Sequence, residues 1–377
     1  MQFDDIIDRS PSFSFKWEKY KGQDILPMWV ADTEFRCAEP ILDMLKERTE
    51  HGLMGYTLPA HHTDANQAVV DWLARQYDWQ IDAEWIVWTP GVVPAFNVAC
   101  KALCEPGDKV LIQTPNYPPL LAAPKLNKLI KVDIATVEIN GRWTIDFDEL
   151  EKQAADPKCK LFIVCNPMNP VGSVFTSEEL QKVADICVAN DVMLCSDEIH
   201  CDLILDENSQ HIPAGKLPDF KGQAITLMAA SKTFNVAGLG TSFAIIEDRR
   251  VRNRFNAAAK GIVPWVTVLG LVATQAAFTK CDDWHVALLD YLRANRDYLA
   301  AEIEKIEGLR LLKPQATFLA WIDASGLGVE NPQQFFEELG VGPSPGADFG
   351  DKNFVRINFG CPRSQLEQAV ALIKAAI

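Results

Sequence analysis

The sequence has no excess of positive charge and no long hydrophobic run of the kind that crosses a membrane. Its 36 Lys and Arg residues are outnumbered by 51 Asp and Glu residues, which gives a net charge of −15. A charge of this sign repels phosphate backbones and anionic lipid surfaces, so we expect neither nucleic acid nor a membrane as partner. An anionic small molecule remains open as a ligand, because a pocket can be locally positive.

The ten cysteines include no Cys-x-x-Cys pair, and several stand inside apolar runs, such as Cys165 in LFIVC and Cys195 in VMLCS. They are typical of reduced, buried thiols in a cytosolic protein. The acidic N-terminus has no apolar signal core, which argues against export. The apolar stretch 262–278 contains Pro264 and several polar residues and is short for a membrane span, so we expect a buried helix there. These features predict a soluble, cytoplasmic protein.

Repeats, low-complexity stretches and flexible linkers are also lacking. The 377 residues exceed one ordinary domain, and 48% hydrophobic with 23% charged residues is the balance of a globular protein. From about residue 50 to 280, β-rich runs alternate with helical patterns, which predicts an α/β fold whose mostly parallel sheet carries helices on both faces. The expected strands are 85–89, 109–113, 161–166, 192–197, 224–229 and 240–246, and the expected helices include 94–103 and 177–190.

After residue 280 the pattern changes to that of a smaller α+β unit. The expected elements are a long helix over 283–306, strands at TFLAWID and FVRINF, a helix at PQQFFEELG and a final helix from Ser364. The first 45 residues have little pattern of their own and are expected to pack against this unit. We therefore predict a large domain over 46–282 and a small domain made of 1–45 with 283–377.

Three polar residues follow the ends of three predicted strands. Asn166 follows LFIVC, Asp197 follows VMLCS, and Lys232 follows ITLMAAS. Ligands of parallel sheets bind at the carboxyl ends of the strands, so an amide, a carboxylate and an amine are expected at one edge. Each residue also has a structural interpretation: Asn-Pro often ends a strand, an Asp often caps a helix, and Ser-Lys is a weak dipeptide signal. Their order and common location favour a shared site.

The segment TPGVV at 89–93 is a Gly-containing turn that enters a helix, where free N–H groups bind phosphate. It is neither a Walker loop nor a G-x-G-x-x-G fingerprint, which disfavours a nucleotide. One chemistry uses this turn together with the three strand-end residues. An aldehyde cofactor with a phosphate and a pyridine ring needs an amine, a carboxylate for the ring nitrogen, a donor to the ring oxygen and an anion site.

The same segments resemble the fold type I family of pyridoxal-phosphate enzymes, the aspartate aminotransferase superfamily of class I/II. Within it, the chain is most similar to the MalY/PatB-type cystathionine β-lyases. The resemblance covers nearly the whole chain, in PMWVAD at 27–32, GYT at 55–57, TPGVVPA at 89–95, TPNYPP at 114–119, CNPMNPVG at 165–172, SDEIHCDL at 196–203, SKTFN at 231–235 and FVRINFGCPR at 354–363. It implies the fold of that family, with a large pyridoxal 5′-phosphate (PLP) domain and a smaller α+β domain.

The resemblance also implies roles for individual residues. Lys232 would form the Schiff base with PLP, then move the substrate α-proton, and Lys232 or Tyr117 would protonate a departing sulfur. Arg356 would hold the substrate α-carboxylate in a bidentate pair. The other residues implied for cofactor binding are Asp197 at the pyridinium nitrogen, Asn166 at the ring hydroxyl, Tyr117 stacked on the ring, and Gly91, Val92 and Ser231 at the phosphate.

Tyr56, in the GYT segment, would reach the phosphate of the neighbouring subunit, so the resemblance implies a homodimer with shared active sites. His200 stands where many aminotransferases place a tyrosine beside the ring oxygen, and it can join Asp197 only if the strand ends near Glu198. Two positions depart from the wider pattern: Ala229 replaces a Ser, and Gly240 replaces an Arg that holds the phosphate. The expected phosphate site is therefore less charged than usual.

Three functions remain open. The first is a PLP-dependent carbon–sulfur β-lyase that cleaves cystathionine or other S-substituted cysteines to thiol, pyruvate and ammonia. The second is a PLP-dependent aminotransferase, and the third is a non-catalytic binding protein, which would not need the amine of Lys232. We expect no metal site, because His61 and His62 have no partner cluster. They precede a helical run for which Thr63 is the expected N-cap.

Overall fold

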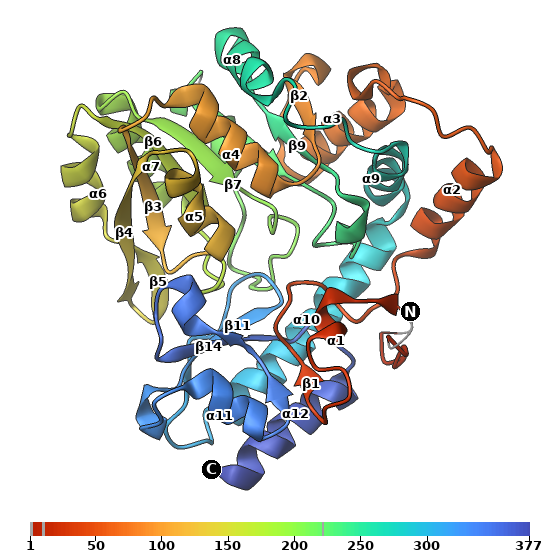
Figure 1. Cartoon of the computed structure of the whole chain (residues 1–377), viewed down its shortest axis with the longest axis vertical. Helices are drawn as coiled ribbons and strands as arrows, with labels where there is room; N and C mark the ends of the chain where they lie inside the picture. The colour runs from red at the N-terminus through yellow and green to blue at the C-terminus, as the bar shows by residue number, and fades with distance from the viewer. Residues whose placement is uncertain (1–2, 10–11, 221) are drawn as a thin grey trace.

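The computed structural model describes residues 3–9, 12–220 and 222–377, with the chain arranged around a large sheet in the upper part of Figure 1. This sheet has eight strands in the order β2-β9-β8-β7-β6-β3-β4-β5. Its strands are β2 (Ile86–Thr89), β3 (Lys109–Thr114), β4 (Ile130–Ile139), β5 (Arg142–Ile145), β6 (Cys159–Cys165), β7 (Met193–Asp197), β8 (Ala224–Met228) and β9 (Ser242–Ile245). All six strands predicted for this region are confirmed, with ends that differ by one or two residues.

The five strands β4, β3, β6, β7 and β8 run parallel, and β2, β9 and β5 pair antiparallel at the two sides. Successive side chains of the central strands enter opposite cores. Val110 and Ile112 of β3 pack into one hydrophobic cluster, whereas Leu111 packs into another. Because both faces are covered, these strands read as continuous apolar runs. The predicted fold, a mostly parallel sheet flanked by helices, is confirmed.

Helices cover both faces of the sheet, with α4, α5 and α8 on one side and α6 and α7 on the other (Figure 1). The helix α7 begins at a capping box in which Thr176 and Glu179 satisfy each other's backbone N–H groups. The helices are α1 (Phe15–Glu18), α2 (Glu39–Glu50), α3 (Thr63–Tyr77), α4 (Val92–Leu103), α5 (Pro118–Leu126), α6 (Phe147–Ala154), α7 (Ser177–Ala189), α8 (Arg249–Ala259), α9 (Val268–Lys280), α10 (Asp282–Ile303), α11 (Pro332–Glu338) and α12 (Arg363–Ala376).

A second, antiparallel sheet lies in the lower part of Figure 1, beside α11 and α12. Its order is β10-β11-β14-β13, and a separate parallel pair joins β1 to β12. The strands are β1 (Leu26–Pro27), β10 (Arg310–Leu311), β11 (Leu319–Asp323), β12 (Val341–Gly342), β13 (Ser344–Pro345) and β14 (Phe354–Asn358). The pairing of β1 with β12 attaches the N-terminal segment to the C-terminal part. The helix α2, in contrast, packs on α9 beside the large sheet, so the domain division at 45/46 stays a prediction.

Two local predictions are corrected, and one element had not been predicted. The helix expected over 262–278 begins only at Val268, because Pro264 disfavours helix before it and the Thr267 hydroxyl caps Gly270 N at 3.1 Å. The N-cap of α3 is His62 rather than Thr63, and its Nδ1 accepts a hydrogen bond from Ala65 N at 3.2 Å. The antiparallel hairpin of β4 and β5 was not expected.

The ten cysteines are free, and all but the half-buried Cys37 are buried. Among the described residues, no helix is long and apolar enough to span a membrane. In the same part of the chain, no group of three His, Cys, Asp or Glu residues is placed to hold a metal ion.

Candidate active site

A cavity of about 450 Å³ lies at the carboxyl edge of the large sheet, between it and the smaller sheet. Its size is that of an ordinary small-molecule pocket. One wall comes from the large sheet and its connections, and another from the N-terminal segment and the C-terminal part. Most of the residues singled out from the sequence line it, namely Gly91, Val92, Tyr117, Asp197, His200, Ser231, Lys232 and Arg356.

Lys232 follows β8 and reaches the cavity with its amine. Its Nζ donates to the backbone carbonyl of Ala31 at 2.7 Å. Burial, followed by the Arg356 guanidinium, lowers the pKa of Lys232 from 10.5 to about 8, against the opposite effect of the Asp32 and Asp197 carboxylates. A lysine with this pKa is partly neutral near pH 8, which is the form that attacks a carbonyl carbon.

Asp197 is the last residue of β7 and is only 2% exposed. Its Oδ1 accepts a hydrogen bond from Ile199 N at 3.2 Å, and no described cation lies within ion-pair distance. Burial raises its pKa to about 7, against the lowering effect of that hydrogen bond and of Lys232. A buried carboxylate without a cationic partner is costly, so this residue is suited to a ligand that brings a protonated nitrogen.

His200 reaches the same cavity because β7 ends at Asp197, which fulfils the condition derived from the sequence. The ring is 1% exposed, and its Nδ1 has no hydrogen-bond partner in the described structure. Burial, followed by the cations Lys232 and Arg356, holds the pKa of His200 well below its usual value. The imidazole is therefore neutral and keeps one ring nitrogen free.

Asn166 follows β6 and does not itself line the cavity, although Cys165 does. Its backbone N–H donates to the Asp197 carbonyl at 2.9 Å, which ties the two strand ends together. Its side-chain Oδ1 accepts from Phe175 N at 3.0 Å. This hydrogen bond identifies the oxygen of the Asn166 amide, so the NH₂ group remains as a hydrogen-bond donor.

The helix α4 begins at the cavity. Gly91 is its N-cap and has a φ of 139°. As a glycine, it has no side chain that could cap the first N–H groups of the helix. The backbone N–H groups at the start of a helix lack partners within the helix and carry the positive end of its dipole. Ser231, Thr241 and Ser242 also line the cavity. The hydroxyls of Thr241 and Ser242 already donate to the carbonyls of Leu239 and Thr89, so the O–H donor for a ligand is that of Ser231. This end of the cavity therefore offers N–H and O–H donors to an anion.

Gly240, which the resemblance aligns with an arginine of other family members, also lines the cavity and has a left-handed φ of 55°; an added Cβ would lie 3.7 Å from the Pro90 carbonyl oxygen. Among the described lining residues, the side-chain cations are Lys232 and Arg356 alone. An anion at the start of α4 would thus be bound by N–H and O–H groups rather than by a charge.

Arg356 lies on β14 in the smaller sheet and is 4% exposed. Its NH1 donates to Asn169 Oδ1 at 2.9 Å, and its NH2 donates to the Trp29 carbonyl at 2.6 Å and to Ser344 Oγ at 3.2 Å. Burial lowers its pKa to about 10, which still leaves it charged. Its Nε is buried and has no partner among the described residues. NH1 makes one of its two possible hydrogen bonds, to Asn169, so the guanidinium keeps a donor for a ligand.

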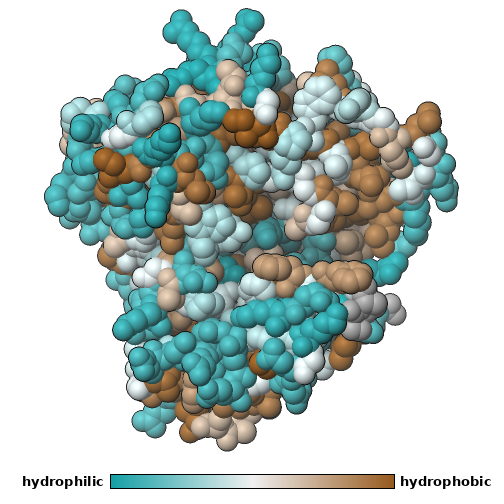
Figure 2. Space-filling view, in the orientation of Figure 1, coloured by the Kyte–Doolittle hydropathy of each residue, from teal (hydrophilic) through white to brown (hydrophobic). Residues whose placement is uncertain are grey.

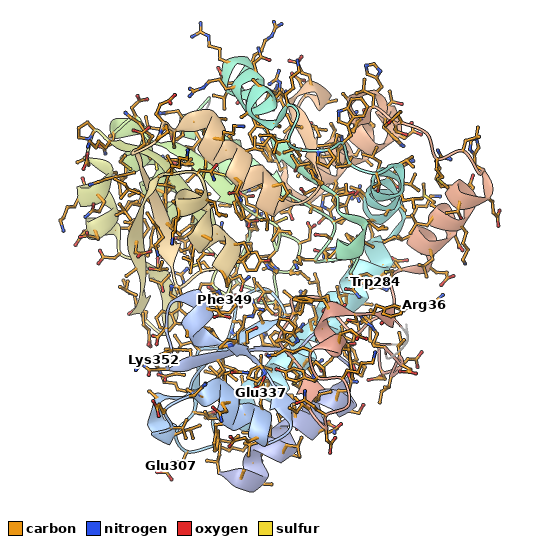
Figure 3. The ribbon with its side chains drawn as sticks, viewed as in Figure 1. Arg36, Trp284, Glu307, Glu337, Phe349 and Lys352 are labelled. Carbon is orange, nitrogen blue, oxygen red and sulfur yellow. The ribbon has the colours of Figure 1, made fainter. Side chains whose placement is uncertain are left out.

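Aromatic rings surround Arg356 and Lys232. Tyr117 is the N-cap residue of α5, and burial raises the pKa of its phenol while the nearby Arg356 lowers it. Phe349, labelled in Figure 3 where the two parts of the molecule meet, lies with its ring centre 4.6 Å from the Arg356 guanidinium carbon. Phe15 and Trp29 pack on each other, with ring centroids 4.8 Å apart, and line the opposite wall.

Several of these contacts were not predicted from the sequence. Asn169 stands inside CNPMNPVG and Trp29 inside PMWVAD, so both belong to segments that carry the resemblance, but no role was assigned to them. Ser344 and Phe15 lie in segments with no recognisable pattern, and only the fold brings them to the cavity. Tyr56, in contrast, lies outside the cavity and is 99% exposed, with its ring edge-on to that of Trp265.

Comparison with known proteins gives consistent relatives. The family model of aminotransferase class I and II matches residues 31–373. The chain is 36% identical to cystathionine beta-lyase PatB of Bacillus subtilis (strain 168) over all of both sequences. It is 32% identical to protein MalY of Escherichia coli (strain K12), with 100% of this chain and 98% of that protein covered.

Solved structures agree with this result. The crystal structure of OvoB is 44% identical with a TM-score of 0.96, covering 100% of this chain and 99% of that chain. The PLP-bound C-S lyase from Staphylococcus hominis is 35% identical with a TM-score of 0.92, covering 100% of this chain and 98% of that chain. The resemblance found in the sequence is confirmed: this chain belongs to the aminotransferase class I and II family.

Proposed function

We propose that this protein is a PLP-dependent carbon–sulfur β-lyase that cleaves cystathionine or other S-substituted cysteines to a thiol, pyruvate and ammonia. The observation that carries the proposal is the convergence of Lys232, Asp197 and the start of α4 on one cavity that also contains Arg356. The relatives named as cystathionine beta-lyase and C-S lyase, which are similar over the full length, support the choice of reaction.

The residues of the cavity fit PLP. The buried Asp197 lacks a cationic partner among the described residues, and a protonated pyridine nitrogen would supply one. The neutral His200 has a ring nitrogen without a partner in the described structure, and Asn166, next to the lining residue Cys165, has an NH₂ group that would donate to the ring hydroxyl. Gly91, Val92 and Ser231 would hold the phosphate, and Tyr117 would cover the ring. Lys232 would form the covalent bond to the aldehyde.

PLP supplies an electron sink that stabilises negative charge at the substrate α-carbon. The protein supplies positioning and proton transfer. Arg356 holds the α-carboxylate through its planar donor set, which a lysine cannot reproduce. Lys232, whose pKa is lowered to about 8, is able to take the α-proton and to hold it near neutral pH. Lys232 or Tyr117 then delivers a proton to the departing sulfur.

A thiolate is a good leaving group, since a thiol has a pKa of about 8.5. The competing reaction, transamination, uses the same residues and differs in where the proton returns. Relatives named as cystathionine beta-lyase or C-S lyase, at 29–36% identity over the full chain, favour elimination. A non-catalytic role is the least favoured, because it leaves the buried amine of Lys232 without a purpose.

The proposal includes a homodimer with shared active sites. Figure 2 shows hydrophobic residues gathered over the part of the molecule that contains α2, α3 and α9. The exposed apolar side chains of the loops beside these helices are Leu53, Met54, Tyr56, Leu58, Ile262 and Trp265. Exposed clusters of this kind mark interaction surfaces, and a second copy would cover them while bringing Tyr56 to its phosphate. A cytoplasmic location is part of the proposal, supported by the ten free cysteines.

The function is tested by supplying cystathionine to the PLP-loaded protein and following pyruvate and free thiol, with and without a keto-acid acceptor. A lyase forms both products at rates that do not depend on the acceptor. Acceptor-dependent turnover with accumulating pyridoxamine phosphate and no thiol would make the aminotransferase the correct assignment. Failure of borohydride to trap PLP on the protein would leave only the non-catalytic function.

A further inference from the structure

Residues 28–35 cross the wall of the cavity as an extended connection, which we call the strap. Two of its backbone carbonyls accept hydrogen bonds from the two cations of the cavity. The carbonyl of Ala31 accepts from Lys232 Nζ at 2.7 Å, and that of Trp29 accepts from Arg356 NH2 at 2.6 Å. The position of the strap therefore determines where both cations are held.

Four further carbonyls of the strap accept hydrogen bonds from the side chains of two asparagines. Asn358, on β14 two residues beyond Arg356, donates to the carbonyls of Val30 and Asp32 at 2.6 and 2.7 Å. Asn235, three residues after Lys232, donates to the carbonyls of Thr33 and Phe35 at 3.0 and 2.8 Å. The strap is thus tied to the two elements that carry the reacting residues.

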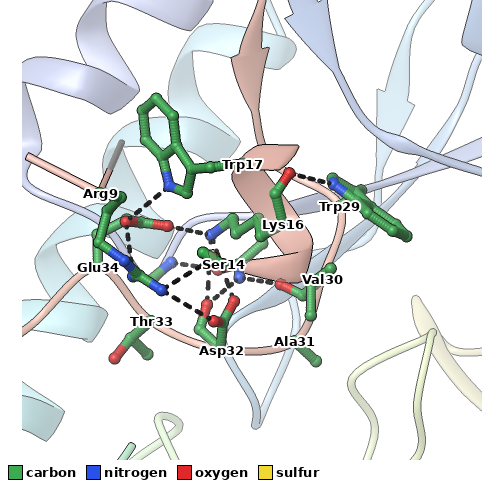
Figure 4. Close-up of polar contacts among 12 residues, drawn as sticks. Arg9, Ser14, Lys16, Trp17, Trp29, Val30, Ala31, Asp32, Thr33 and Glu34 are labelled. Atoms are coloured by element: carbon green, nitrogen blue, oxygen red, sulfur yellow. Dashed lines mark hydrogen bonds and ion pairs between the residues drawn. The ribbon is translucent and has the colours of Figure 1, made fainter. Parts of the chain in front are cut away.

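On its other side the strap is held by a cluster of buried charges, drawn in Figure 4. Lys16 is buried, with its side chain 1% exposed, and its Nζ lies 2.7 Å from Glu34 Oε1 and 3.3 Å from the Asp32 carbonyl. Arg9 NH1 lies 3.1 Å from Glu34 Oε2, and Trp17 Nε1 donates to the same oxygen at 3.2 Å. The two acids of the cluster belong to the strap, and its two cations come from the preceding segment.

Neither Lys16 nor Glu34 lines the cavity, so any effect of this pair on the reaction is indirect. A buried ion pair is a weak source of stability, but loss of one partner leaves the other charge buried and uncompensated. Without Lys16, Glu34 would keep Arg9 and Trp17 at Oε2 but lose the partner of Oε1. The carboxylate would then shift towards the more exposed Arg9 and take its own backbone with it. The carbonyls of Trp29 and Ala31, a few residues away, would then lose their fixed positions.

We propose that Lys16 and Glu34 are positioning residues that hold the strap, and through it Arg356 and Lys232, in the geometry that receives an amino-acid substrate. This inference rests on the proposed function for the identity of the substrate. The Trp29 carbonyl occupies NH2 of Arg356 and leaves Nε without a partner in the described structure. The strap thus orients the guanidinium while part of its donor set stays free for a carboxylate.

The test uses the PLP-loaded Lys16→Met variant and its control Lys21→Met. Lys21 is exposed and pairs only with Glu18 in the described structure, so it has the same chemistry without contact to the strap. We expect KM for an S-substituted cysteine to rise about tenfold in Lys16→Met, the loss typical of one weakened hydrogen bond to a charged group. PLP content is expected to stay unchanged and kcat to fall less than KM rises. Lys21→Met should match the wild type.

A double-mutant cycle with Glu34→Gln separates positioning from general destabilisation. If the two residues act as one unit, the double variant has a KM no higher than the worse single variant. Purely additive effects on KM, or a KM equal to that of the wild type well below the unfolding temperature, would overturn the proposal. Should Lys16→Met fail to fold, Glu34→Gln alone is expected to raise KM in the same way.

Hydrogen exchange of the strap amides gives a readout that needs no turnover. We expect faster exchange over residues 28–35 in Lys16→Met than in the wild type, with exchange in β6, β7 and β8 unchanged. Strap exchange as slow as in the wild type overturns the inference. A wild type without lyase activity would count against the proposed function alone, and the exchange result would then decide the role of Lys16.

Discussion

Replacement of Arg356 by lysine tests the substrate site most directly. The charge is kept, so the buried position does not lose its cation, but the planar fork is lost. In the protein the guanidinium is oriented by Asn169, Trp29 and Ser344 and lies against the ring of Phe349. A lysine amine at this place keeps at most part of these contacts and meets a carboxylate as a single point charge.

The expected size of the effect follows from the number of hydrogen bonds. A bidentate pair has two charge-assisted bonds, of which the lysine keeps one. One hydrogen bond to a charged group contributes about 1.5–3 kcal/mol. The loss predicts a decrease in kcat/KM of about 10- to 150-fold, since 1.36 kcal/mol corresponds to a factor of ten. The PLP absorbance of the variant should match that of the wild type.

The assay compares an S-substituted cysteine with its carboxamide in the wild type, in Arg356→Lys and in the control Arg310→Lys. Arg310 is an exposed residue of β10, which β11 separates from β14 in the same sheet, and it is paired with Glu138. We expect the wild type to prefer the acid strongly, the Arg356 variant to lose most of that preference, and the control to keep it. Full efficiency of Arg356→Lys with the acid, or equal use of acid and amide by the wild type, would refute the reasoning.

The other predictions concern the cofactor and the dimer. Lys232→Ala should abolish turnover while circular dichroism stays native, and wild-type rates in this variant would contradict the assignment. Borohydride trapping of PLP on the cofactor-free protein should become faster as the pH rises to about 8, where Lys232 loses its proton, and a rate independent of pH between 6 and 9 would contradict the lowered pKa. Asp197→Asn should lower kcat by about 100-fold or more, because an amide cannot keep the ring nitrogen protonated; the measurement is turnover at saturating PLP. Co-expressed Lys232→Ala and Tyr56→Phe chains should regain activity, since a mixed dimer with shared sites has one complete site, and the absence of complementation together with a fully active monomer in light scattering would count against the dimer.

Local sequence patterns were sufficient for six of the eight strands of the large sheet and for the residues at or after the ends of β7 and β8. The apolar runs of β6, β7 and β8 are continuous because both faces of these strands are covered, and this requirement is visible in the sequence. Asp197 and Lys232 were found because parallel strands end at one edge. The β4–β5 hairpin was missed although its turn, Asn140-Gly141, with φ values of 53° and 76°, is a known hairpin signal.

The family of the chain and the role of Arg356 were predicted from the resemblance of several short segments to a known enzyme family. No spacing rule places a residue near position 356 beside one near position 232, because the two lie on different sheets.

By itself, the sequence determined the order of strands and helices and which residues are exposed to a cofactor at the sheet edge, since both depend on local periodicity and chain direction. Only the tertiary structure decided what surrounds those residues. Lys232 and Arg356 donate to the carbonyls of Ala31 and Trp29, and Lys16 is buried against Glu34. Such contacts join segments up to 327 residues apart. They depend on how the N-terminal segment packs between the two sheets, and no local pattern encodes that packing.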